Sequence, residues 1–216
     1  FWGQDVVAQI YYRDESLAFY PFPTLANGRV TSIGASQQKT DFYGGKLTIN
    51  SKPLDALTLT WGIDAEHENF DANQQFFNLN SAAASGGMQL DKAFKVERYP
   101  GYSITNIAPF LQSSYDIDAI TLSGGVRYQY MENRIDDFVG YTQQQAVASD
   151  KATSADAVPG GKTDYNNLLF NAGILGHVTD RQQLWFNFSQ GFEIPDPAKY
   201  YGAGTYQLVD GHYRLL

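Results

Sequence analysis

The chain has no cysteine among its 216 residues. Disulfide bonds, thiolate metal sites and cysteine nucleophiles are therefore excluded. It also lacks any apolar run approaching the roughly 18 residues that a membrane-spanning helix needs. Basic residues are in deficit, because 15 Lys and Arg stand against 23 Asp and Glu, giving a net charge of −8. Nucleic acid is not an expected partner, since binding it requires clustered Lys and Arg.

What is present indicates a folded, β-rich chain: aromatic residues make up 15% of it, alongside 20 Gly and 8 Pro. No linker-like change of composition divides it, so we expect one unit. The mean hydropathy of −0.35 is that of a soluble protein. A membrane β-barrel gives the same average, because lipid-facing apolar residues alternate with lumen-facing polar ones. The chain opens at Phe1 without an initiator Met or signal-peptide features, so we expect an N-terminal part to precede it.

Apolar and polar residues alternate along several segments. In "ALTLTWGIDAEHENF" one face carries Leu57, Leu59, Trp61, Ile63 and Ala65, while Thr and acidic residues occupy the other. The segment "AITLSGGVRYQYMEN" repeats this pattern, and "NNLLFNAGILGHV" does so less cleanly. Four more segments complete seven candidate strands: "DVVAQIYY", "DFYGGKLTIN", "NIAPFLQSSY" and "QLWFNFSQGF".

Short and long connections alternate between these strands. Three tight turns with Asp, Pro, Ser or Thr are expected, at Ser51–Asp55, Asp116–Asp118 and Val178–Arg181. Three long polar loops are expected, at Pro21–Gln38, Asp71–Ser103 and Val139–Lys162. This alternation is typical of an outer-membrane barrel with turns in the periplasm and loops outside the cell.

A soluble β-sandwich would also have alternating strands. Two features favour the barrel. The opposite faces carry few charges at mid-strand, which suits a wet lumen, and rings gather near the expected membrane borders as aromatic girdles do. These rings are Tyr43, Trp61, Tyr115, Tyr128, Tyr130, Phe188 and Phe192.

Two long segments resemble the barrel of TonB-dependent outer-membrane siderophore receptors. In "NIAPFLQSSYDIDAITLSGGVRYQYMEN" the family's "L-x-x-G-x-R-Y" pattern falls on Leu122, Gly125, Arg127 and Tyr128. In "LWFNFSQGFEIPDPAKYYGAGTY" the pattern "F-S-x-G-F-x-x-P" falls on Phe188, Ser189, Gly191, Phe192 and Pro195. The stretches "PDPAKYYG" and "DVVAQIYYRDESLAFYPFP" are most similar to the branch that imports ferric aerobactin and related citrate-hydroxamate chelates.

The resemblance implies an all-β, antiparallel, up-and-down transmembrane barrel, of which residues 1–216 supply about seven of some 22 strands. The N-terminal plug domain and the remaining strands are expected outside this chain. The implied function is an outer-membrane receptor that binds a ferric siderophore and imports it with energy from the TonB complex, which engages the missing N-terminal segment. Outer-membrane lipid and lipopolysaccharide are further implied partners. No cofactor is implied, because the siderophore itself carries the iron, and the protein is not expected to be an enzyme.

Recognition of a ferric chelate calls for rings over its apolar faces and cations for its carboxylates. Candidate contacts are therefore the aromatic and basic residues near the loop ends of strands, with the Lys199–Tyr201 group favoured because two prolines restrict its loop. They are Arg13, Phe19, Tyr20, Phe22, Arg98, Tyr99, Tyr102, Lys199, Tyr200 and Tyr201. Girdle or loop packing would equally explain such rings, and pairing with an acid such as Glu97 would explain a lone Arg. Arg127 has lumen-facing parity and is expected to bridge to lumen acids or to the plug.

Enzymatic alternatives have little support in the sequence. His67, His177 and His212 form no spaced metal motif, and Ser189 lacks the G-x-S-x-G context of a nucleophile elbow. No catalytic or metal residues are expected. Two other classes stay open at this point: a passive diffusion porin and a soluble carbohydrate-binding β-sandwich.

Overall fold

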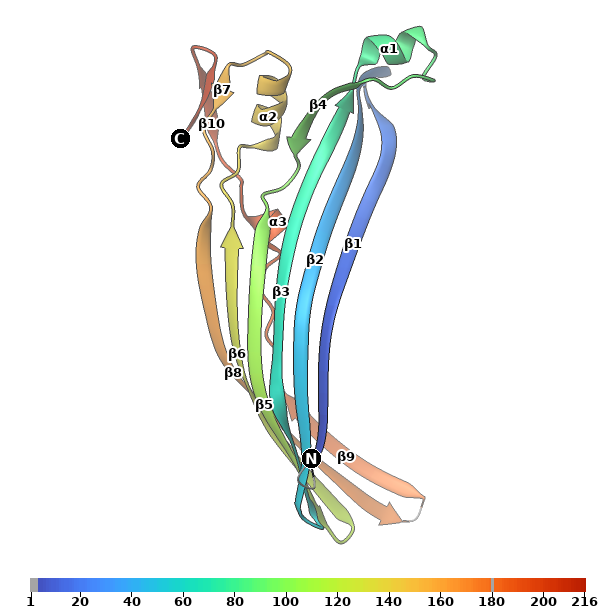
Figure 1. The fold of residues 1–216 in the computed structure, drawn as a ribbon, viewed down its shortest axis with the longest axis vertical. Helices are drawn as coiled ribbons and strands as arrows, with labels where there is room; N and C mark the ends of the chain where they lie inside the picture. The colour runs from blue at the N-terminus through green and yellow to red at the C-terminus, as the bar shows by residue number, and fades with distance from the viewer. Residues whose placement is uncertain (1–3, 180) are drawn as a thin grey trace.

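The computed structural model describes residues 4–179 and 181–216. One curled antiparallel sheet dominates it, with the order β1-β2-β3-β5-β6-β8-β9 and with β4 paired to β3, and a small sheet has the order β10-β11-β7 (Figure 1). The strands are β1 (Asp5–Ala26), β2 (Arg29–Leu54), β3 (Leu57–Phe77), β4 (Lys92–Glu97), β5 (Tyr102–Ile117), β6 (Ile120–Ile135), β7 (Ser154–Ala155), β8 (Gly161–Thr179), β9 (Gln182–Ser189), β10 (Tyr206–Val209) and β11 (His212–Leu215). The helices are α1 (Leu79–Ala84), α2 (Tyr141–Ala148) and α3 (Pro197–Tyr200).

The seven candidate strands correspond to the seven strands of the main path, and the tight turns also form. Leu54 pairs with Leu57, Ile117 with Ile120, and Thr179 with Gln182, so each hairpin closes within a few residues. Asp180, which belongs to the third expected turn, lies outside the described residues. All three turns gather at one end of the molecule, whereas α1, α2 and the small sheet gather at the other (Figure 1). None of the helices in the described part of the chain is long and apolar enough to cross a membrane.

The prediction of a long loop at Pro21–Gln38 is wrong. Strands β1 and β2 continue through this stretch and are joined by a two-residue turn at Asn27 and Gly28, with φ angles of 51° and 74°. Asn-Gly with both φ angles positive is the favoured sequence of a tight hairpin turn. Two prolines and a mixture of polar and apolar residues around it break the alternation, so the pattern of this stretch predicts a loop.

The other two long connections exist but contain more regular structure than expected. Strand β3 runs on to Phe77, and α1 and β4 occupy much of the stretch before β5. The second connection holds α2 and β7. Asn78 caps α1 by accepting a hydrogen bond from the Asn80 backbone N–H at 2.8 Å, which is a cap residue's usual role.

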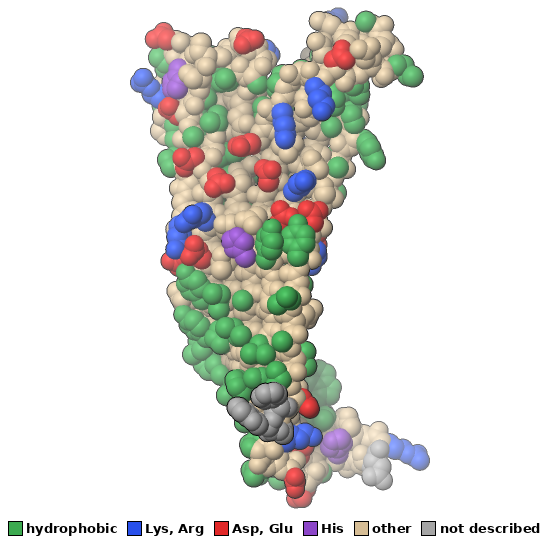
Figure 2. Space-filling model, viewed as in Figure 1, with side chains coloured by type: hydrophobic (Ala, Val, Ile, Leu, Met, Phe, Trp, Pro, Cys, Tyr) green, Lys and Arg blue, Asp and Glu red, His purple; other side chains and the backbone are tan. Residues whose placement is uncertain are grey.

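The pairing register divides the sheet into two distinct faces. Trp61 lies opposite Leu111 and Ile49, and Val126 lies opposite Phe170, so apolar side chains share what we call the outer face. Ile49 is buried, but Trp61, Leu111 and Phe170 retain 41%, 44% and 48% of their accessible surface, whereas a sandwich would bury them. The sandwich reading is therefore wrong. In Figure 2, hydrophobic side chains gather over the lower part of the visible face, and most of the charged side chains are scattered over the part above it.

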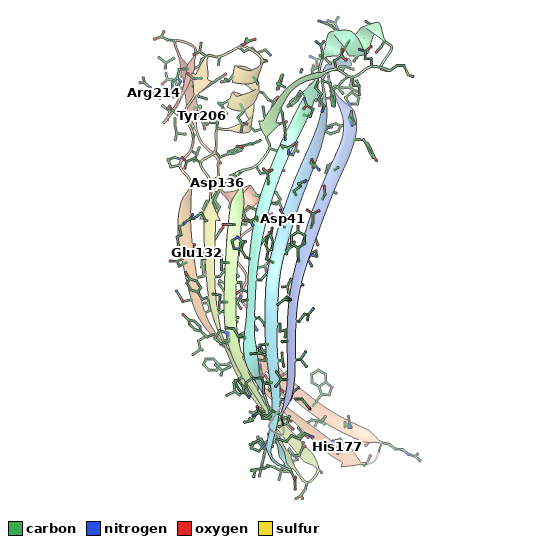
Figure 3. All side chains as sticks on the ribbon, viewed as in Figure 1. Asp41, Glu132, Asp136, His177, Tyr206 and Arg214 are labelled. Carbon is green, nitrogen blue, oxygen red and sulfur yellow. The ribbon has the colours of Figure 1, made fainter. Side chains whose placement is uncertain are left out.

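The upper border of the apolar outer face is marked by rings and then by charge. Tyr12 and Tyr43 pair across β1 and β2 with ring centroids 5.0 Å apart, and the Tyr12 hydroxyl donates to Asp41 at 2.9 Å. Asp41 and Glu132 lie part-way up the strands, well away from His177 near the short turns (Figure 3). Phe192, expected in the girdle, instead packs against Tyr165, with the two ring centroids 5.9 Å apart.

The opposite, inner face is polar and cross-linked. The Asp64 carboxylate accepts a hydrogen bond from Arg127 Nη1 at 2.6 Å, and Lys46 Nζ lies 3.7 Å away. Gln112 and Asn171 exchange hydrogen bonds through their side-chain amides at 3.2 and 3.1 Å. The expectation that Arg127 pairs with an acid on this face is confirmed, and the sheet has one face suited to lipid and one suited to water.

Placing a charge on the outer face tests this division. Ile63→Lys should lower the free energy of unfolding in a bilayer by about 2–4 kcal/mol, the cost of Lys near the midplane of a barrel wall. Asn69→Lys is the matched control, because it lies on the same face of β3 beyond the apolar band. It should cost no more than about 1 kcal/mol. Urea titration of the protein folded in lipid vesicles measures both; equal losses would contradict the assignment of the faces.

Candidate ligand-binding pocket

A pocket of about 440 Å³ lies at the end of the molecule away from the short turns. Three stretches far apart in sequence form it: the residues after β4, the start of α2, and the segment from α3 to β10. Two cationic residues and four tyrosines line it together: Arg98, Lys199, Tyr99, Tyr141, Tyr201 and Tyr206. No carboxylate belongs to this lining. The pocket therefore suits an anionic ligand that has flat or apolar faces.

Hydrogen bonds hold both the backbone and the side chain of Arg98 in place. Its N–H donates to the Ala72 carbonyl at 3.0 Å, which holds the residue against β3 just after β4 ends. Its guanidinium donates from Nη1 to Gln74 Oε1 at 2.6 Å and lies 5.6 Å from the Tyr99 ring centroid. Throughout the described residues, no carboxylate oxygen comes within 4.0 Å of this guanidinium. Its charge is thus held in place without being neutralised.

The segment after β9 brings Lys199 and Tyr201 to the same pocket. Asp196 caps α3 by accepting from the Ala198 backbone N–H at 3.0 Å, and its other oxygen lies 3.1 Å from Lys199 Nζ. Pro197 begins α3 and is buried, as suits a proline at a first helical position. Unlike Arg98, Lys199 already has an acid partner.

Tyr206 closes another side of the pocket. Its hydroxyl accepts a hydrogen bond from the Gly140 N–H at 3.1 Å, which ties β10 to the start of α2. In Figure 3, Tyr206 and Arg214 lie together at the end that carries the small sheet. The position of this wall therefore depends on how the small sheet is attached.

Four of the candidate contact residues come together in this pocket: Arg98, Tyr99, Lys199 and Tyr201. The neighbouring Tyr200 points elsewhere and keeps 72% of its surface exposed. Tyr102 stacks on Phe70 with ring centroids 4.7 Å apart and donates to Glu68 at 3.1 Å, so it forms part of the strand wall.

The candidates on β1 do not join the pocket lining. Arg13 pairs with Glu15 at 2.9 Å and lies 4.0 Å from the Phe42 ring centroid. Phe19, Tyr20 and Phe22 lie within the long strand, at an irregularity in its pairing with β2, rather than on a loop. They form a separate aromatic stretch along this edge of the sheet.

Sequence reasoning missed three residues of the pocket region: Tyr141, Tyr206 and Gln74. Tyr141 opens a short helix inside a stretch that was read as loop, and Tyr206 follows a glycine-rich segment without strand-like alternation. Gln74 looked like one of several polar residues at a strand end. Only the fold brings these positions near Arg98, so nothing in their local sequence could have singled them out.

A larger groove of about 810 Å³ between β4 and α2 suits such a ligand less well. Its lining includes Asp71, Glu97 and Asp137 and no aromatic residue. Burial, together with the nearby charge of Asp71, raises the pKa of Glu97 above its usual value. Lys95 is the one cation beside the three acids of this lining, so the groove is less favourable to an anion than the first pocket. Among the described residues, no group of three or more His, Asp or Glu side chains could hold a metal ion.

A hydrogen-bonded chain attaches the small sheet. Asp156 accepts from the Leu215 backbone N–H at 2.9 Å and lies 3.0 Å from His212 Nε2, while His212 Nδ1 lies 2.7 Å from Ser154 Oγ. The Leu215 N–H, followed by His212, holds the pKa of Asp156 below its ordinary value. These contacts link β7 to β11, which pairs with the strand that carries Tyr206.

This link should weaken in acid. A carboxyl group whose pKa is lowered in the folded state stabilises that state above its ordinary pKa of about 3.9, and the contribution disappears as pH falls through the lowered value. Hydrogen exchange of the Leu215 amide, corrected for its intrinsic rate, should therefore accelerate below about pH 4. In Asp156→Asn this added acid sensitivity should be absent. A wild-type profile that is flat into strong acid would contradict the role of Asp156.

Gly202 sets the path of the segment that carries Lys199 and Tyr201. Its φ is +79°, and a Cβ at this position would lie 2.8 Å from the Phe138 ring. Gly202→Ala should destabilise the local structure by about 1–2 kcal/mol, the cost of left-handed backbone for other residues. Amide exchange across residues 196–206 should become about tenfold faster. Gly191→Ala is the matched control, because its added methyl would meet no atom within 4 Å; equal acceleration in both variants would contradict this explanation.

Comparison with known proteins identifies the family. The family described as "TonB dependent receptor-like, beta-barrel" matches residues 1–213. The chain is 62% identical to the ferric aerobactin receptor of Klebsiella pneumoniae and 58% identical to that of Escherichia coli, over 100% of its own length and 30% of theirs. It is 43% identical to the rhizobactin receptor of Rhizobium meliloti (strain 1021), over 99% of the chain and 29% of that relative.

A solved structure agrees on the fold. The copper transporter OprC superposes with a TM-score of 0.66 over 91% of this chain and 28% of its own, at 15% sequence identity, a likeness that speaks for the architecture alone. The chain spans about 30% of the length of the curated relatives that it matches. The family is one of outer-membrane receptors, not of enzymes or diffusion porins. The chain belongs to the β-barrel family of TonB-dependent receptors.

Proposed function

We propose that this chain is part of the barrel of a receptor that binds a ferric citrate-hydroxamate siderophore of the aerobactin type and imports it with energy relayed through TonB. Identities of 62% and 58% to two ferric aerobactin receptors support this ligand class. The pocket chemistry supports it independently, because cations and rings meet there without a lining carboxylate.

The chemistry of binding follows from how such a chelate carries its iron. Siderophore oxygens surround the Fe(III), so the protein meets only the outside of the chelate. Its carboxylates call for a guanidinium, which offers paired N–H donors in a plane, and its carbon framework calls for rings. A pocket of about 440 Å³ is within the usual size range of small-ligand sites.

The observation that carries the proposal is the charge of Arg98, which is unpaired within the described part of the chain. In the described residues it has rings beside it and a neutral hydrogen-bond acceptor, but no carboxylate within 4.0 Å. A cation in this state gains more from an incoming carboxylate than one that must first give up an acid partner. Lys199, which is paired with Asp196 at 3.1 Å, is the weaker of the two contacts.

The rest of the receptor completes the barrel in this proposal. Every residue of β1 and of β9 is exposed, as expected for strands that pair with neighbours elsewhere in a longer barrel. A plug domain would fill the lumen against the inner face, where Asp64 and Arg127 lie. An N-terminal segment would engage TonB, and moving the plug would admit the chelate.

The outer face would contact the membrane. Its apolar lower part would meet lipid, and the charged residues above it, such as the Lys162–Glu132 pair at 2.7 Å, would meet lipopolysaccharide head groups. A mixture of charges fits this layer, because the head groups carry phosphates and bound cations.

Removing the Arg98 charge tests the proposal in the full-length receptor that contains this chain. Arg98→Gln should raise the dissociation constant for ferric aerobactin by about 10- to 100-fold, since a hydrogen bond to a charged group contributes about 1.5–3 kcal/mol. Lys199→Gln should have a smaller effect. Binding is measured by quenching of tryptophan fluorescence in detergent.

Arg13→Gln is the matched control, because Arg13 already pairs with Glu15 and lies outside the pocket lining. It should leave the dissociation constant within about threefold of wild type. Ferric rhizobactin is the second probe, given the 43% identity to a rhizobactin receptor. Wild-type receptor that binds neither chelate would overturn the proposed function.

A further inference from the structure

Gln74 lies behind the pocket, on the inner face of β3. It retains only 5% of its accessible surface, and Gly34 on the neighbouring strand leaves room for its amide: a Cβ at Gly34 would lie 2.5 Å from Gln74 Nε2. Gln74 does not line the pocket itself. Any influence on a ligand must therefore pass through the residues that it holds.

Two pocket residues converge on one oxygen of this side chain. Gln74 Oε1 accepts a hydrogen bond from Arg98 Nη1 at 2.6 Å and another from the Tyr141 hydroxyl at 2.6 Å. Because a guanidinium has only donors, the amide oxygen rather than its nitrogen must face Arg98. One buried amide therefore positions a cation from the end of β4 and a ring from the start of α2.

A second arginine on the inner face, Arg127, is held in a different way. Arg127 is held by the Asp64 carboxylate at 2.6 Å, so a negative charge, shared with Lys46 at 3.7 Å, lies directly against its guanidinium. Asp64 and Gln74 lie on the same strand and the same face, so an acid at position 74 would suit the strand pattern equally well. The residue present holds the guanidinium just as closely but adds no negative charge.

We propose that Gln74 is a positioning residue that keeps Arg98 oriented toward the pocket while leaving its positive charge uncompensated for an anionic group of the ligand. This inference rests on the proposed function and assigns a specificity role to a residue outside the pocket. An acid here would hold the same geometry and lose the electrostatic attraction, because the internal carboxylate would compete with that of the ligand.

Gln74→Glu is the decisive variant, because it keeps an acceptor oxygen and adds one negative charge. The neighbouring Arg98 guanidinium should keep this new carboxylate ionised. In the full-length receptor, its dissociation constant for ferric aerobactin should rise about tenfold or more. Gln74→Met removes the acceptor without adding charge and should weaken binding less than Gln74→Glu does. A purely structural role predicts the reverse order, because Glu would rescue the hydrogen bonds and Met would not.

Two controls separate this effect from general damage. Asn73→Glu adds the same charge one residue away on the outer face of β3 and should leave binding within about threefold of wild type. In an Arg98→Gln background, adding Gln74→Glu should raise the dissociation constant by less than about threefold, because the positive charge that Glu would neutralise is already gone. Melting temperatures near that of wild type verify that each variant folds.

The outcomes are distinct. The assignment is supported if Gln74→Glu binds more weakly than Gln74→Met and if this difference disappears in the Arg98→Gln background. Binding by Gln74→Glu at the wild-type level, or an equal loss with and without Arg98, would overturn it while the proposed function stands. Wild-type receptor without affinity for ferric aerobactin would remove the proposed function and this inference together.

Discussion

The alternation of apolar and polar residues along each strand is the constraint on which the rest depends. Because side chains on a strand point to opposite faces in turn, a chain whose pattern has a period of two builds one apolar and one polar surface at once. Trp61 and Ile63 thereby take the outer face, and Asp64 and Arg127 the inner one. The two faces need different surroundings. A curled wall in a membrane meets this need, because lipid contacts one face and water the other.

The inner face uses its cations in two ways. Arg127 of β6 pairs with the Asp64 carboxylate of β3, which also lies near Lys46 of β2, and these contacts cross-link the sheet. Beyond the apolar band, Arg98 is held by the neutral oxygen of Gln74 and by nearby rings. The first arrangement favours a rigid wall and the second a receptive surface, although both fix the guanidinium at 2.6 Å. Under the proposed function, the first guanidinium supports the wall and the second receives the ligand, and the charge of the residue that holds each one makes the difference.

Sequence reasoning succeeded wherever local periodicity decides the structure. It predicted the seven strands, the short hairpins and the facing of Arg127. Four of the ten candidate contacts, Arg98, Tyr99, Lys199 and Tyr201, line one pocket, and their role in binding stays a prediction. It failed at Asn27–Gly28, where a strong turn signal lay inside a polar stretch read as loop. It also missed Gln74 and Tyr206, because their role arises from contacts between distant segments that no local pattern encodes.

The most direct test of the account is a structure of the full-length receptor with ferric aerobactin bound. We expect the chelate between the strand wall and the segment that follows β9, with a carboxylate on the Arg98 guanidinium and the rings of Tyr99 and Tyr141 beside it. The hydrogen bond from Arg98 to Gln74 should remain. A chelate seated instead along β1 against Arg13 and Phe19, with Arg98 unengaged, would contradict it.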